Sequence, residues 1–218
     1  MAISKFNYNS FNVTPVAGNA LSFNSDADGF TTQSSSSMVL IKTVTASSSS
    51  TVTFVNGTSD VVLDSTYPIY RFVFTNCHPS ANGPYFQVNF RDGSTAYDAT
   101  KTSTFFAARH SEDDSAAALA YNASNDLAQG TGDHFIDGFG INNDNDSSIS
   151  GELFLFNPSS TTFVKHFIAR TNYVANNYYS VDSYTAGYFN TTSAVNAIQF
   201  KFTSNNIDSG VIKLYGIS

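Results

Sequence analysis

The stretch that decides the fold is AIQFKFTSNNIDSGVIKLYGIS, residues 197–218. Its first half alternates apolar and polar residues, with Phe200 and Phe202 on one side. After a polar break that contains glycine, Ile212 and Leu214 continue the alternation. Period-two alternation on both sides of such a break predicts a β-hairpin with one buried face. Because a free strand would fray at this position, we expect the hairpin to close the core that earlier strands begin.

Strand patterns also fill the region before this stretch. Residues 39–45 and 51–55 are two apolar runs separated by serines, and we expect them to pair as a hairpin. Residues 69–77 carry apolar atoms on both faces, which predicts a central strand, and residues 85–90 should pair back onto it. Residues 116–123 have a helix-forming composition, although a strand remains the alternative in an all-β context.

Short strands that recur at a spacing of roughly 8–14 residues predict an all-β chain. We expect an antiparallel two-sheet sandwich, jelly-roll-like, over residues 37–218. Residues 1–36 lack a long regular pattern, and their spaced aromatics predict an extended N-terminal arm. We expect Phe6, Tyr8 and Phe11 to anchor this arm on the domain or on a neighbour; packing along its own sheet has nearly equal weight.

The charge balance limits the classes of partner. The net charge is −7, the isoelectric point is near 4.7, and charged residues are only 12% of the chain. A protein that binds nucleic acid needs a basic stripe to neutralise phosphates. Docking on an anionic lipid surface would also need positive charge on the protein. No apolar run approaches the length of a membrane span. We therefore expect neither a nucleic-acid partner nor a membrane.

Cys77 is the only cysteine, so no disulfide can form within one chain. This fits folding in a reducing cytoplasm, with Cys77 acting as a small buried apolar residue. The first residues show no basic region followed by an apolar one, and thus no signal-peptide pattern.

No pattern of catalytic residues is visible, and we expect neither catalytic residues, nor a metal, nor a cofactor. The histidines share no metal-ligand spacing, and no Gly-x-Ser-x-Gly turn or glycine-rich phosphate loop occurs. The loop around Asp144 and Asp146 offers oxygen ligands of the kind that calcium takes, but it lacks the EF-hand pattern. We expect that loop, and the charged turn 112–114, to face water.

Tyrosines concentrate between residues 172 and 184, among asparagines. Tyrosine rings stack on sugar faces, and asparagine forms hydrogen bonds with hydroxyl groups. The candidate binding residues for a host-surface glycan are Tyr173, Tyr178, Tyr179 and Tyr184. The alternative is that these side chains pack against the sheet or against a neighbouring subunit.

Four phrases of the sequence stand out: DSTYP (64–68), FQVNFRDG (86–93), FNPSSTTFVKHFI (156–168) and NIDSGVIKLYG (206–216). Together they resemble virion structural proteins of marine tailed bacteriophages, those that infect cyanobacteria and other abundant ocean bacteria. The similarity runs from about residue 38 onward and reaches into the arm through FNVTPV (11–16). It implies a capsid-decorating or tail-appendage protein and brings no known catalytic residues with it.

The resemblance implies a non-enzymatic virion component, assembled in the host cytoplasm, whose partners are other capsid or tail proteins. Self-association and the arm would hold it in place, as a homo-oligomer for which a trimer is one option. The face that carries Lys213 and Tyr215 would then meet the arm or a neighbouring subunit. The alternative function is a receptor- or glycan-binding module at a tail fibre.

Overall fold

The computed structural model describes residues 13–14, 19–24, 26, 28–34 and 37–218. Its contacts divide the chain into two units, Met1–Val39 and Leu40–Ser218. The first unit contains an antiparallel hairpin, β1 (Asn19–Phe23) with β2 (Phe30–Ser34), in which the rings of Phe23 and Phe30 stack. The expectation of a wholly extended arm therefore missed a hairpin. The anchoring residues Phe6, Tyr8 and Phe11 lie outside the described residues.

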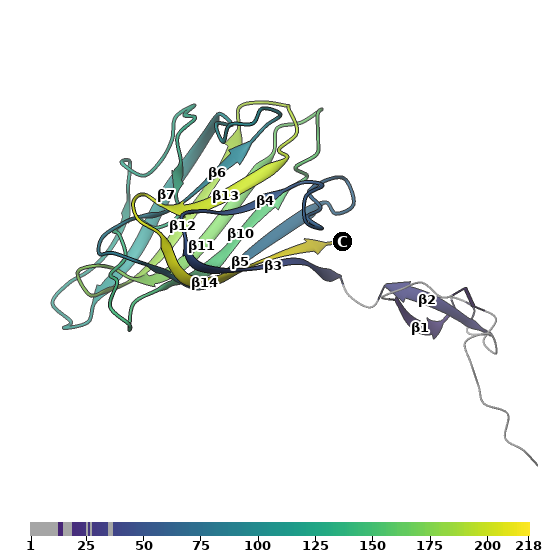
Figure 1. The fold of residues 1–218 in the computed structure, drawn as a ribbon, viewed down its shortest axis with the longest axis horizontal. Helices are drawn as coiled ribbons and strands as arrows, with labels where there is room; N and C mark the ends of the chain where they lie inside the picture. The colour runs from purple at the N-terminus through teal and green to yellow at the C-terminus, as the bar shows by residue number, and fades with distance from the viewer. Residues whose placement is uncertain (1–12, 15–18, 25, 27, 35–36) are drawn as a thin grey trace, which may run out of the picture. The chain divides into compact units, whose positions relative to one another are not determined.

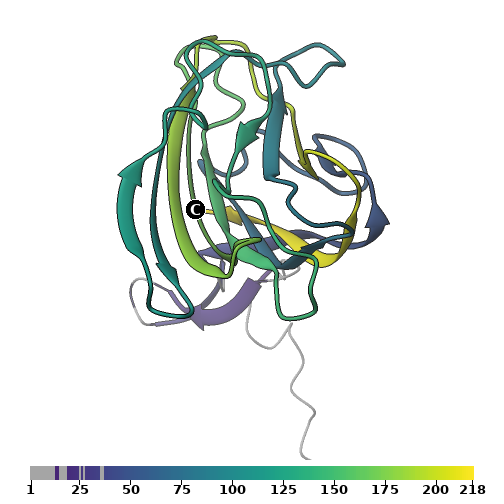
Figure 2. The same ribbon diagram turned by 90° about the vertical axis from the view of Figure 1, so that its left-hand side faces the viewer.

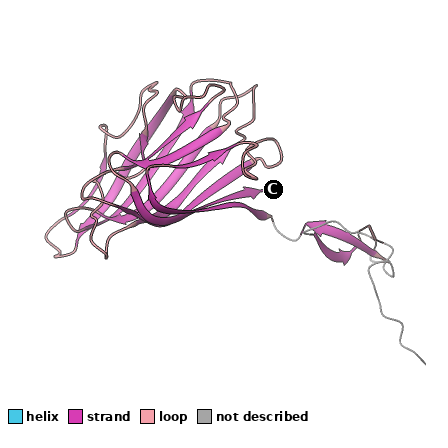
Figure 3. Cartoon of the chain, in the orientation of Figure 1, coloured by secondary structure: helices cyan, strands magenta, loops and turns pink. Residues whose placement is uncertain are grey.

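The second unit is built from strands and loops, and the described residues form no helix (Figure 3). None of them belongs to a helical segment with the length and apolar character that a membrane crossing requires. The eight-stranded sheet contains, in spatial order, β3 (Met38–Ser49), β14 (Ile207–Ile217), β5 (Ile69–Pro79), β10 (Ile149–Phe156), β11 (His166–Val174), β12 (Tyr179–Phe189), β7 (Lys101–Ser111) and β8 (Ala117–Tyr121). The four-stranded sheet contains β4 (Val52–Val55), β13 (Ala197–Phe202), β6 (Phe86–Arg91) and β9 (His134–Phe135).

The two sheets form the expected antiparallel sandwich, and their strand order is that of a jelly roll (Figures 1 and 2). Four consecutive strand pairs are each divided between the sheets: β3 and β4, β5 and β6, β9 and β10, β13 and β14. β11, β12, β7 and β8 then extend the large sheet beyond β10. Residues 116–123, whose composition suits a helix as well as a strand, contain the edge strand β8.

The same strand order overturns three expected hairpins. Residues 39–45 and 51–55, residues 69–77 and 85–90, and the two halves of the closing stretch lie in opposite sheets and do not pair with each other. Alternation had correctly indicated the buried face of residues 85–90 and of the closing stretch, where Phe200 and Leu214, for example, are fully buried. Alternation does not specify the partner strand, however, because a strand buries the same face in a hairpin as in a sandwich.

Irregular backbone at the start of β14 accompanies the crossing from β13. The register of β14 against β5 shifts twice, between Ile207 and Ser209 and again between Ser209 and Val211. Such bulges bend a strand where it turns from one sheet to the other. Gly210 lies in this bend at φ 136°, and a Cβ there would meet the Cys77 Cα at 2.7 Å, so only glycine fits.

An aromatic core fills the space between the sheets. The Phe200 ring lies within 5.2–6.4 Å, centre to centre, of four neighbouring rings, those of Phe54, Phe72, Phe74 and Phe86. The pairs with Phe54 and Phe74 are edge-on, and ring contacts of this kind add to the free energy gained from burial. Cys77 is buried in the same core, as the sequence indicated, and burial raises the pKa of its thiol to about 12.

A polar layer lies beneath β11, β12 and β7, on the inner face of the large sheet. His134 contacts the hydroxyls of Ser103 and Thr185, and burial lowers its pKa to about 3. Asp137 is fully buried and accepts hydrogen bonds from the backbone N–H groups of Phe86 and Gly140. Burial nevertheless raises the pKa of Asp137 to about 7. Residues 134–141 were expected to form one strand, but only the first two, His134–Phe135, do so.

Candidate functional site

A row of side chains crosses the outer face of the large sheet. Each of these residues lies directly opposite the next one on the neighbouring strand. This outer ladder runs from β14 to β8 through Lys213, Val73, Glu152, Arg170, Tyr184, Phe106 and Tyr121. Side chains directly opposite on neighbouring strands interact, so the ladder forms one continuous strip.

The middle of the outer ladder is a stack. The Tyr184 ring lies parallel to Phe106, with an interplanar angle of 3° and ring centres 5.0 Å apart. The Arg170 guanidinium lies 4.9 Å from the centre of the same Tyr184 ring. Arg170 also donates two hydrogen bonds to Asp182, at 2.8 and 3.1 Å, and this partner raises its pKa above the ordinary value. Fork-shaped pairing and stacking together orient the guanidinium.

A second ion pair lies further along the outer ladder. Arg71 donates to Glu152 at 2.7 Å, and its guanidinium lies 5.6 Å from the centre of the Phe154 ring. Both members are about one-third exposed, so the pair orders the surface more than it stabilises the fold.

Two hollows lie on the outer face of the large sheet. One, of about 470 Å³, lies over β5, β10 and β11 and is lined by both arginine–carboxylate pairs. The other, of about 410 Å³, lies over β11, β12 and β7 and is mainly apolar, with Ile168 and Tyr188 in its lining. The outer face thus presents one hollow that carries charged pairs and one that is mainly apolar.

The structure does not bring the four candidate tyrosines together. Tyr173 is buried and faces inward, where its hydroxyl accepts hydrogen bonds from Gly138 N–H (2.7 Å) and Ser183 Oγ (3.4 Å). Its assignment as a glycan-binding residue is therefore wrong. The reason is its position on β11, where Tyr173 continues the inward alternation of Ala169 and Thr171. Tyr184 belongs to the outer ladder instead.

Tyr178 and Tyr179 lie together at one end of the large sheet, Tyr178 in the turn between β11 and β12 and Tyr179 at the start of β12. They line a hollow of about 510 Å³ with Glu112, Asp113 and Asn177. Tyr178 is 49% exposed and adopts φ 60°, a conformation that few residues other than glycine take. The end hollow thus brings the acidic turn 112–114 beside the tyrosine-rich turn at 177–179, which lie far apart in the sequence.

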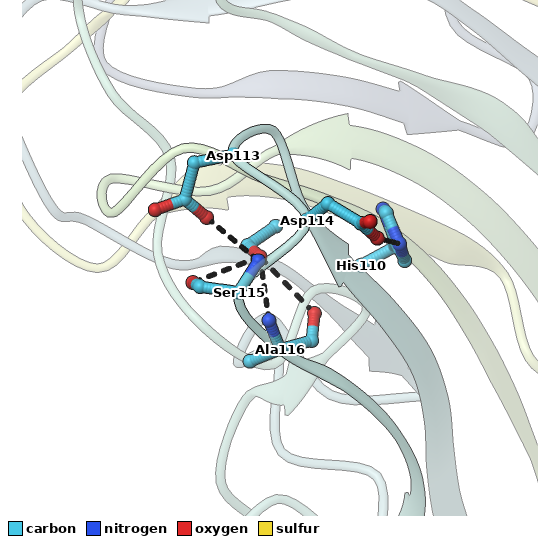
Figure 4. Close-up of polar contacts among 6 residues, drawn as sticks. His110, Asp113, Asp114, Ser115 and Ala116 are labelled. Carbon is cyan, nitrogen blue, oxygen red and sulfur yellow. Dashed lines mark hydrogen bonds and ion pairs between the residues drawn. The ribbon is translucent and has the colours of Figure 1, made fainter.

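The acidic turn beside the end hollow is shaped by its own side chains (Figure 4). The Asp113 carboxylate accepts a hydrogen bond from the Ser115 N–H at 3.0 Å, and contacts with Ser115 lower the pKa of Asp113. Asp114 lies 3.0 Å from His110. Ser111 Oγ accepts from the Ala116 N–H, which closes the turn. The carboxylates therefore fix the loop that joins β7 to β8.

Within the described residues, no group of three or more histidine, cysteine or acidic side chains is placed to hold a metal ion. In the loop expected to face water, the Asp144 carboxylate accepts a hydrogen bond from Asn142 Nδ2 at 2.7 Å.

The outer ladder was not predicted from the sequence. Its one visible sign was the outward set of Thr102, Thr104 and Phe106, which alternates with the buried set of β7.

Comparison with protein-family models, with curated proteins and with solved structures finds no match to this chain.

Proposed function

We propose that this chain is a non-enzymatic structural component of a phage virion, which decorates the capsid or forms part of a tail or fibre appendage. In this proposal a jelly-roll module is held in the particle through the outer face of its large sheet. The resemblance of four sequence phrases to marine phage virion proteins motivates the class of assembly. The exposed aromatic and apolar surface motivates the mode of attachment.

The observation that carries the proposal is the exposure of large apolar side chains on strands that share one face. They are Phe106, Leu119, Tyr121, Ile168 and Tyr188, each between 38% and 73% exposed. A contiguous apolar surface of this kind marks an interaction site. The low charge content, 12% of residues, fits a surface that makes close contacts with neighbours.

Quantitative mass spectrometry of particles purified from the phage that encodes this chain tests the proposal. The chain should be present, at a copy number that matches either the capsid lattice or the symmetry of the tail. Its absence from purified particles would overturn the proposal.

A matched pair of variants tests the mode of attachment. Ile168→Asp places a charge in the apolar hollow and should reduce incorporation into particles. Thr58→Asp places the same charge on an exposed turn between β4 and β5 and should leave incorporation unchanged. Equal incorporation of the two folded variants would remove the outer face as the attachment surface.

The end hollow supports a second candidate function, glycan binding. It combines an exposed tyrosine ring with the amide of Asn177 and the carboxylates of Glu112 and Asp113, groups that stack on sugars and accept hydrogen bonds from their hydroxyls. Binding to host surface polysaccharide should weaken at least about tenfold in Tyr178→Ala, the loss expected for one buried stacking contact. Tyr188→Ala removes an exposed tyrosine at the far end of β12 and should bind normally. Equal binding by both variants would exclude the end hollow.

A further inference from the structure

β8 is an unprotected edge of the large sheet. It is the teal strand at the left margin of Figure 2, and its sequence AALAY is exposed at every position. Natural edge strands carry a charge or proline, are very short, or are covered. The other three edges of the sandwich follow this rule in part, since β3 carries Lys42, β4 has four residues and β9 has two. β8 has neither a charge nor a proline.

The hydrogen-bond pattern shows which backbone groups of β8 are free. Asn122 N–H donates to Phe105 O and Ser111 N–H donates to Ala116 O, so the even-numbered residues of β8 face β7. The N–H and C=O groups of Ala117, Leu119 and Tyr121 consequently point away from β7. Within the part of the chain that the structure describes, nothing pairs with them.

We propose that β8 pairs with β8 of a second copy of this chain, antiparallel and centred on Leu119. The free groups are symmetric about Leu119, so a twofold axis there matches Ala117 with Tyr121 of the second copy and Leu119 with its own counterpart. Each of the three matches is a hydrogen-bonded pair, which gives about six backbone hydrogen bonds. A twofold dimer requires such self-complementarity, which a second copy of this edge supplies in full.

The side chains of β8 suit this pairing. Leu119 and Tyr121 lie on the outer face beside Ala108 and Phe106, so the two copies would join their apolar surfaces into one. Ala118 and Ala120, on the opposite face, are small enough to allow close approach. Two five-residue strands bury less area than a standard stable interface, so the contact is weak in dilute solution and is strengthened where many copies are held together. The pairing rests on the proposed self-association, but it is tested without particles.

Cysteine cross-linking tests the pairing. The single native cysteine, Cys77, is buried and should not compete with an introduced cysteine for oxidation. In Leu119→Cys the two Cα atoms would lie about 5.5 Å apart, within disulfide range. In Ala118→Cys the matching atoms lie two residues out of register, beyond about 7 Å. Under mild oxidation Leu119→Cys should form linked dimers at least about tenfold faster than Ala118→Cys. Equal rates would overturn the proposed register.

A proline variant tests the pairing without new chemistry. Leu119→Pro removes an N–H that points away from β7, so the β7–β8 ladder keeps its hydrogen bonds. Sedimentation at rising concentration should show dimer for the wild type and monomer for a folded Leu119→Pro. A wild type that remains monomeric at the highest soluble concentration would overturn the proposal. Failure of the virion assignment would show instead as absence from particles, whatever the solution state.

Discussion

Replacing Asp137 with asparagine should change how the stability of this protein depends on pH. The wild-type carboxyl is fully buried, and its pKa rises from 3.8 to about 7 on folding. Between these values the folded state holds a proton that the unfolded state has released. Stability from this group is therefore complete below about pH 4 and is lost as the pH rises through 7. An asparagine side chain cannot ionise, so the variant lacks this loss.

The magnitude follows from the shift. About three pH units correspond to about 4 kcal/mol, at 1.36 kcal/mol for each unit. The asparagine oxygen can replace only part of the carboxylate, which accepts from both Phe86 N–H and Gly140 N–H, and the lost bond costs about 1–3 kcal/mol. We therefore expect Asp137→Asn to be the less stable protein near pH 4.5 and the more stable one near pH 8.

Urea unfolding of both proteins at several pH values is the appropriate assay, with the difference between them as the quantity of interest. The pH profile of the wild type alone is not decisive, because His134 acts in the opposite direction. Folding lowers the pKa of His134 from 6.5 to about 3, so its contribution to the free energy of unfolding rises between pH 3 and 6.5 and offsets the loss from Asp137. A difference that stays constant from pH 4.5 to pH 8 would refute a protonated Asp137 in the folded state.

Two further predictions concern side chains whose roles the structure reassigns. Tyr173→Phe removes the buried acceptor of the Gly138 N–H and should lower the free energy of unfolding by about 1–3 kcal/mol. Tyr184→Phe keeps its ring stack and should change the free energy of unfolding by less than about 0.5 kcal/mol. Urea titration of both variants compares the two effects. Cys77, buried and with a pKa near 12, should react with a thiol reagent at pH 8 only after denaturant is added; rapid labelling of the native protein would contradict its burial.

Alternation was sufficient to predict the all-β class and the buried faces of residues 85–90 and of the closing stretch. It could not predict which strands pair with each other. The segment 203–206 between β13 and β14 is short enough for a hairpin, yet it crosses about 10 Å from one sheet to the other. Two residues flanking this turn, Phe202 and Ile207, are both buried, which fits either connection. Local sequence therefore cannot choose between them, and only the bulges in β14 record the choice.

The candidate site shows the same limit. Tyr178 and the turn 112–114 could each be found as polar, aromatic or acidic segments, but their contact depends on the pairing of β7 with β12. Tyr173 was misjudged because its asparagine-rich neighbourhood outweighed a period-two pattern that already placed it inside. The outer ladder depends on the register of seven strands, and no single stretch of sequence contains that information.

In the large sheet β14 lies between β3 and β5. β3 and β5 are synthesised early, so they lack this shared neighbour until β14 is synthesised. While the ribosome is still adding residues, β3 has no partner, and the aromatic faces of β5 and β6 lack part of their cover. Pairing between strands that are distant in the sequence slows folding and leaves apolar surface exposed in folding intermediates, which are therefore prone to aggregate. The nascent chain should therefore stay open until residues 207–217 emerge, and its yield in cells should depend on chaperones that shield it during that interval.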